Sequence, residues 1–91
     1  DLGVASVLIL GMGRTGTAAY DRIEETFATV GVDADTYRVG GHTAVGRNVL
    51  FADVEDTAFW RGLRMAHVEC VILAMDSVEA KESAARALRT K

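Results

Sequence analysis

The fold of this chain is decided by the stretch Gly11-Met12-Gly13-Arg14-Thr15-Gly16, which fits the pattern G-x-G-x-x-G. An apolar run of strand length, residues 7–10, comes directly before it, and a helix-like segment follows it. A second strand-like run, residues 28–32, leads to Asp33, about 20 residues after the first glycine. Strand, glycine turn, helix, strand and acid in this order form the dinucleotide-binding fingerprint, which is far more specific than the glycines alone.

Each glycine of the motif has its own physical task. Gly11 allows a sharp turn out of the strand, Gly13 lets a phosphate approach the backbone, and Gly16 lets the helix pack closely on the sheet. The free N–H groups of the first helical turn and the helix dipole then attract the phosphate. Asp33 would accept hydrogen bonds from ribose hydroxyls and repel a 2′-phosphate, which predicts a preference for NAD(H), ADP or AMP over NADP(H). The alternative is a tight strand–helix turn that binds no ligand.

Length and composition bound the possible classes of protein. The 91 residues make one domain at most, and 49% apolar with 25% charged residues is typical of a globular chain. The net charge of −3 argues against a nucleic-acid partner. No apolar run approaches the roughly 20 residues that span a bilayer, and no signal peptide is visible, so we expect a cytoplasmic protein without direct membrane insertion. The single cysteine, Cys70, excludes an internal disulfide and is expected to be a small core residue.

Strand-like and helix-like segments alternate four times along the chain. The expected strands cover about residues 5–10, 28–32, 48–52 and 69–74, and the expected helices cover about residues 15–26, 56–64 and 77–89. Residues 36–45 suggest a weak helix or an irregular turn, because Gly40 and Gly41 should fray a helix there.

The strands are continuously apolar, which indicates a parallel sheet covered on both faces. Right-handed crossovers then predict an α/β, Rossmann-like doubly wound sheet in the order 3-2-1-4. A complete dinucleotide-binding domain has about six strands. Residues 1–91 are therefore expected to form a single, incomplete domain with its fourth strand at an open edge. Such a chain is either a fragment of a longer protein or a unit that associates with a partner.

The glycine-rich stretch, residues 7–16, resembles the N-terminal lobe of the regulator-of-potassium-conductance domain. This lobe is the nucleotide-binding module of Trk-type potassium-uptake regulators and Kef-type potassium efflux systems. Residues 31–35, 46–56 and 68–76 resemble the family's second, third and fourth strands. The resemblance covers about residues 5–89 and is closest to the Kef-type branch, mainly over residues 46–63.

The resemblance implies a set of contacts to an adenine nucleotide, NAD(H) or AMP/ADP. The phosphates would be contacted by Gly11, Met12, Gly13, Arg14, Thr15 and Gly16; the ribose by Asp33, flanked by Ala34; the adenine by Asp53 and Val54; and the opposite side of the groove would be closed by Ala74, Met75 and Asp76. Two of these residues have simpler interpretations. Arg14 is alternatively a solvated arginine, and Asp76 is alternatively a helix cap that pairs with Glu79.

Three functions compete. The resemblance implies a regulatory domain, not an enzyme, that controls potassium transport or efflux, with a homodimer or a membrane cation-transport subunit as its partner. The alternative is the cofactor-binding half of an NAD-dependent oxidoreductase, but His42 and His67 are interpreted as solvated surface histidines, and with Cys70 they do not form a metal-ligand set. A third possibility is a ligand-free interaction unit in which Phe59 and Trp60 form an exposed patch, although such residues more often pack in a core.

Overall fold

Strands and helices alternate strictly in the computed structural model, which describes residues 2–91. The elements are β1 (Val7–Leu10), α1 (Arg14–Ile23), β2 (Thr29–Asp33), α2 (Thr36–Ala44), β3 (Val49–Phe51), α3 (Thr57–Gly62), β4 (Cys70–Leu73) and α4 (Val78–Arg89). Every element expected from the sequence is present, with ends that differ by a few residues. None of the helices within residues 2–91 is both long and apolar enough to cross a bilayer.

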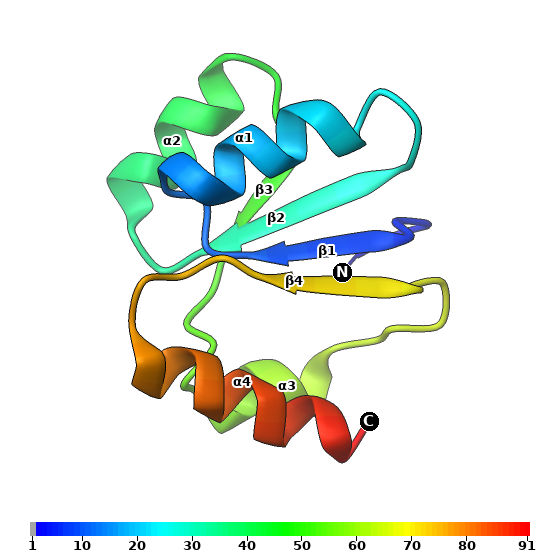
Figure 1. Cartoon of the computed structure of the whole chain (residues 1–91), viewed down its shortest axis with the longest axis vertical. Helices are drawn as coiled ribbons and strands as arrows, with labels where there is room; N and C mark the ends of the chain where they lie inside the picture. The colour runs from blue at the N-terminus through cyan, green and yellow to red at the C-terminus, as the bar shows by residue number, and fades with distance from the viewer. Residues whose placement is uncertain (1) are drawn as a thin grey trace.

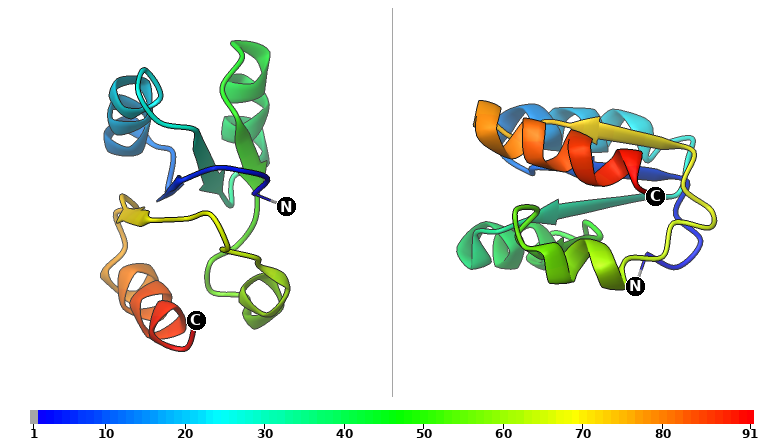
Figure 2. Two further views of the ribbon diagram at one scale, coloured as in Figure 1. Left: turned by 90° about the vertical axis from the view of Figure 1, so that its right-hand side faces the viewer. Right: turned by 90° about the horizontal axis from the view of Figure 1, so that it is seen from below.

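All strand pairs are parallel, and the sheet order is β3-β2-β1-β4, which confirms the predicted Rossmann-like arrangement. Helices α1 and α2 lie on one face of the sheet and α3 and α4 on the other, so the molecule has three layers (Figure 1, Figure 2). The chain changes faces between α2 and α3. As a result β1 and β4, which are neighbours in the sheet, lead into helices on opposite faces, and a crevice opens between their carboxyl ends.

Burial on both faces explains why the strands are apolar at every position. Leu8 and Leu10 of β1 pack into the core beneath α3 and α4, while Val7 and Ile9 pack into the core beneath α1 and α2. All four side chains are buried. An alternating strand would leave one of these faces polar, so the continuous apolar run is what holds a three-layer structure together.

The aromatic pair expected either in the core or on the surface lies in the core. Trp60 is buried, and its indole N–H donates to the carbonyl oxygen of Val54 at 2.6 Å. Phe59 stands edge-on to it, with 5.0 Å between ring centres. These contacts join α3 to the loop that follows β3 and exclude Trp60 from an exposed patch.

The expectation that Cys70 is a core residue is wrong, because its side chain is exposed. Cys70 is the first residue of β4, which has β1 on one side and no further strand on the other among residues 2–91. The periodicity of an apolar strand does not reveal which of its positions lies at an uncovered corner of the sheet.

The expectation that glycine frays residues 36–45 is also wrong, because α2 runs unbroken through Gly40 and Gly41. Two features compensate for the glycines. Asp35 caps the helix, its carboxylate accepting from the N–H groups of Tyr37 at 2.9 Å and Arg38 at 3.3 Å. The last turn is anchored by His42, which is buried.

We expect the Asp35→Ala substitution to lower the free energy of unfolding by about 1 kcal/mol, because it removes this cap. Asp35→Asn keeps an acceptor oxygen and should stay within a few tenths of a kcal/mol of the parent. Urea denaturation followed by circular dichroism measures both. Equal stability of the two variants would mean that the cap does not hold α2.

Candidate functional site

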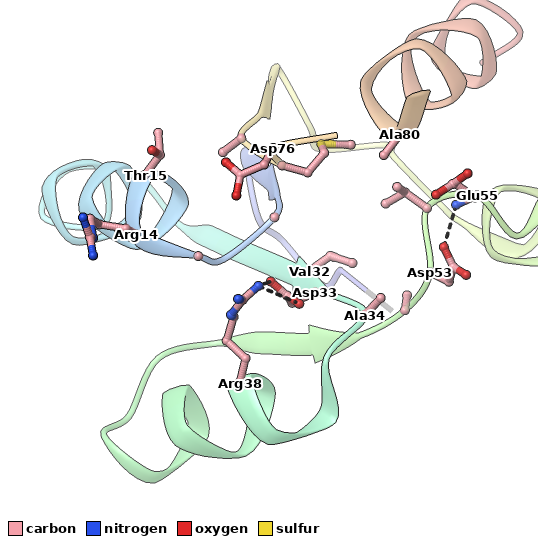
Figure 3. Close-up of a pocket in the computed structure, with 16 residues that line it drawn as sticks. Arg14, Thr15, Val32, Asp33, Ala34, Arg38, Asp53, Glu55, Asp76 and Ala80 are labelled. Carbon is pink, nitrogen blue, oxygen red and sulfur yellow. Dashed lines mark hydrogen bonds and ion pairs between the residues drawn. The ribbon is translucent and has the colours of Figure 1, made fainter. Parts of the chain in front are cut away.

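A cleft of about 510 Å³ lies at the carboxyl ends of the strands, where the sheet opens between β1 and β4 (Figure 3). Its volume is within the range of small-molecule sites. The lining residues end or follow the four strands or lie in the first turn of the helices after them: Gly11, Gly13, Arg14, Thr15, Val32, Asp33, Ala34, Arg38, Ala52, Asp53, Val54, Glu55, Ala74, Met75, Asp76 and Ala80. This is the position at which open α/β sheets bind their ligands.

Two of the three motif glycines are required by the protein itself. Gly11 has a φ of +99°, and a Cβ there would lie 2.6 Å from the backbone nitrogen of Met75. A Cβ on Gly16 would collide with the carbonyl oxygen of Gly11. Both glycines therefore let the loop turn and pack closely on itself and on Ala74 and Met75, directly after β4, whether or not a ligand is present.

Gly13 differs from the other two glycines. Its φ of −75° suits any residue, and the nearest atom to a Cβ placed there would be Nη1 of Arg38 at 3.8 Å. The backbone N–H groups of Gly13, Arg14 and Thr15 have no acceptor among residues 2–91. Gly13 thus sits at a helix start that faces the cleft with free donors, and no packing constraint within the described chain explains its missing side chain.

Asp33, the last residue of β2, is only 7% exposed and lies beneath this loop. Its Oδ2 accepts from the N–H of Met12 at 2.7 Å, and its Oδ1 accepts from the N–H of Asp35 at 2.9 Å. Arg38 adds an ion pair, with Nη1 3.2 Å from Oδ2. Burial alone raises the pKa of Asp33, but the hydrogen bonds from Met12, Asp35 and Arg38 outweigh it and hold the pKa below its usual value.

Arg38 is the functional candidate that the sequence analysis missed. It projects from the first turn of α2 toward the carboxylate of Asp33, as Figure 3 shows, and its side chain is 48% exposed at the cleft. A sequence signal was available, because a basic residue in the first turn after the ribose-binding acid is placed to reach the same part of the ligand.

The second missed residue is His42, and the expectation of a solvated surface histidine is wrong. It is 8% exposed, and Nε2 lies 2.8 Å from the carbonyl oxygen of Met12. A carbonyl only accepts, so Nε2 carries the proton. Nδ1 lies 3.3 Å from Nη1 of Arg47, which only donates, so Nδ1 accepts. His42 therefore joins the glycine loop to Arg47 through its two ring nitrogens.

Met12 is fixed at every polar atom of its backbone and by its side chain. Its N–H donates to Asp33, and its carbonyl accepts from His42 and from the hydroxyl of Thr17 at 3.1 Å. The side chain is 1% exposed, and a Cβ on Gly31 of β2 would come within 2.5 Å of its sulfur. The structure thus assigns the N–H of Met12 to Asp33, and the donors left for a phosphate begin at Gly13.

The remaining predicted site residues surround the cleft. Arg14 and Thr15 are exposed at the start of α1, and Figure 3 shows the Arg14 side chain directed away from Asp33. Figure 3 shows Ala34 and Asp53 on one side of the cleft and Asp76 on the other. Val54, Ala74 and Met75 also line it.

The carboxylates of Asp53 and Asp76 differ in their hydrogen bonds to the backbone. Asp53 Oδ1 accepts from the N–H of Glu55 at 2.9 Å, which fixes the turn after β3. Asp76 is exposed and is not the cap of α4, contrary to the alternative considered for it. Ser77 is the cap, and its hydroxyl accepts from the N–H of Ala80 at 3.2 Å. Asp76 therefore lines the cleft and does not cap the helix.

The parallel sheet, the glycine turn and the acid beneath it define a nucleotide-binding domain of the Rossmann class. The family model of the TrkA-N domain matches residues 7–91, so the chain belongs to that family. A search of curated protein sequences finds no match.

Among solved structures, the chain is similar to the NAD(P)-binding domain of an exopolyphosphatase-related protein from Archaeoglobus fulgidus. The TM-score is 0.86 at 20% identity, over 94% of this chain. The match spans 65% of the length of the other chain. At this identity the likeness supports the fold.

We expect Asp33→Asn to lower the free energy of unfolding at pH 7 by about 1–3 kcal/mol, because an amide cannot accept from both backbone N–H groups. The pKa of Asp33 is depressed in the folded chain. Its stabilisation is therefore complete above the unfolded pKa of about 3.9 and is lost as the pH falls through the lower, folded value. The loss of stability below about pH 4 should accordingly be shallower in Asp33→Asn than in the parent.

Urea denaturation at several pH values tests this expectation. The control is Asp76→Asn, which changes an exposed carboxylate of the same cleft that has no hydrogen bond among residues 2–91. It should leave the stability at pH 7 within about 0.5 kcal/mol of the parent. Similar losses in the two variants would show that the buried hydrogen bonds of Asp33 contribute nothing special.

Proposed function

We propose that the cleft binds an adenine dinucleotide, NAD(H), and that the chain is a regulatory ligand-binding domain. The main support for this proposal is the environment of Gly13 in the cleft. No contact among residues 2–91 requires a glycine there, yet the residue stands at a helix start beside N–H donors that have no acceptor in the same part of the chain. A bound diphosphate explains both features, because it needs close access to the backbone and accepts those hydrogen bonds.

In this proposal each part of the cleft has a role toward the ligand. The diphosphate lies over Gly13 and the first turn of α1, and the adenosine ribose lies near Asp33. The adenine lies along Asp53 and Val54. AMP and ADP share the adenosine and phosphate contacts, so they bind as smaller ligands of the same site. Membership of the TrkA-N family and the NAD(P)-binding description of the similar archaeal structure support this choice of ligand class.

A regulatory role is favoured over the oxidoreductase alternative by the placement of His42. Both ring nitrogens are engaged, one with the Met12 carbonyl and the other with Arg47, and the ring is buried behind the loop. A general acid or base must reach the substrate, and this ring does not line the cleft. In the oxidoreductase alternative the reacting groups come from elsewhere in a longer protein.

The regulated process in this proposal is potassium transport or efflux, on the cytoplasmic side of a membrane. The support is the resemblance of residues 5–89 to Trk- and Kef-type regulatory lobes and the TrkA-N family match. The partner is then a second copy of this domain or a cation-transport subunit. Regulation of this kind requires that the ligand bind two conformations with different affinity.

We expect Gly13→Ala to weaken NADH binding by at least about tenfold, because the added methyl group occupies the path of the phosphate. The fold should survive, with at most about 1 kcal/mol lost from the poorer helix N-cap. Gly13→Val should abolish binding. Isothermal titration with NADH, NAD⁺, AMP and ADP measures the affinities, and thermal denaturation checks the fold.

The matched control is Gly41→Ala in α2, where a Cβ meets no atom of the described residues within 4 Å. It should leave NADH affinity unchanged and stabilise the helix by up to about 1 kcal/mol. An unchanged NADH affinity in Gly13→Ala would remove the proposed position of the diphosphate. If the parent chain binds none of the four nucleotides, the proposed function is wrong.

A further inference from the structure

The carboxylate of Asp33 has no free acceptor position for a ribose. Oδ2 already accepts from the N–H of Met12 and from Arg38, and Oδ1 accepts from the N–H of Asp35 and lies 3.5 Å from the same guanidinium nitrogen. The two backbone donors are fixed by the loop and by the start of α2. Arg38 is therefore the one of the three partners whose movement can expose the carboxylate without unfolding the backbone.

Arg38 also lies beside the proposed path of the nucleotide. Its backbone is held in the capped first turn of α2, and its Nη1 is the atom nearest to the missing side chain of Gly13. With 48% of its side chain exposed, the guanidinium has room to turn and donors to spare. A planar guanidinium with several donors is suited to a phosphate monoester, which it binds through two parallel hydrogen bonds.

We propose that Arg38 is the specificity-determining residue of the cleft and that it allows NADP(H) to bind as well as NAD(H). The inference rests on the proposed function and adds the ligand's 2′-phosphate to it. With NADP(H), Arg38 stays over Asp33 and donates to the 2′-phosphate. With NAD(H), the guanidinium turns away and the ribose hydroxyls donate to the exposed carboxylate instead.

This assignment reverses the expectation drawn from Asp33 alone. A free carboxylate beneath the ribose repels a 2′-phosphate, whereas a carboxylate in an ion pair presents little net charge to it. The rest of the cleft is acidic, with Asp53, Glu55 and Asp76 in its lining. Arg14 is directed away, so Arg38 is the cation that faces Asp33 within the described chain (Figure 3).

The test compares affinities for two pairs of ligands that differ only at the 2′-position. NADH and NADPH form one pair, and AMP and 2′,5′-ADP form the other. The parent chain should bind NADPH within about tenfold of NADH. Arg38→Gln removes the charge and keeps a side chain of similar reach. It should weaken NADPH and 2′,5′-ADP by at least about tenfold and change NADH and AMP by less than about threefold.

Two further variants complete the design. Arg38→Lys keeps the positive charge but lacks the planar guanidinium that forms two parallel hydrogen bonds, so it should retain part of the NADPH affinity. Arg86→Gln removes an exposed arginine of α4 that does not line the cleft, and it should change none of the four affinities. Thermal denaturation of each variant separates loss of binding from loss of fold.

The outcomes distinguish the two proposals. If NADH binds but NADPH does not, or if Arg38→Gln weakens NADH and NADPH by the same factor, Arg38 is only a structural partner of Asp33. The specificity inference is then wrong, and the proposed function stands. If the parent binds none of the four ligands, both proposals fall.

Discussion

The glycine loop depends on the hydrogen bond from the N–H of Met12 to the buried carboxylate of Asp33, at 2.7 Å. This contact ties the turn after β1 to the end of β2, across two parallel strands. A hydrogen bond to an ionised acceptor is roughly twice as strong as one between neutral groups, and here it forms away from solvent. By taking up the Met12 N–H beneath the loop, Asp33 determines that the next donors, from Gly13 onward, are the ones presented to the cleft.

The loop is also held from its far side, by the carbonyl of Met12. His42 and Thr17 both approach that oxygen, and His42 passes the contact on to Arg47, which forms a bidentate pair with Asp21 of α1 at 2.8 Å for each bond. The two successive peptide units that flank Met12 are thus fixed by residues from α1, α2 and β2. A loop held in this way loses little conformational entropy when an anion binds, which favours binding by a preformed site.

The order of elements, the sheet order and the place of the cleft could all be predicted from the sequence. They follow from local patterns: continuous apolar runs for covered parallel strands, and residues at the strand ends for the cleft. Arg38 and His42 were missed because their roles depend on how α2 is rotated on the sheet. The two residues are four apart and share one face of the helix, but Gly40 and Gly41 between them suggested a broken helix. The four-residue spacing of Arg38 and His42 places them on one face only if residues 36–44 form a helix, and the sequence left that helix in doubt.

The three motif glycines separate what the fold needs from what a ligand needs. Gly11 and Gly16 are enforced by backbone conformation and by close contacts inside the protein, so they would be needed in any ligand-free strand–helix turn of this shape. Gly13 is not enforced in either way. The same contrast applies to the groups around Asp33, where two backbone donors are fixed and one arginine is half exposed. In a cleft whose floor is rigid, discrimination between ligands falls to the side chain that is free to move, and in this part of the cleft that side chain is Arg38.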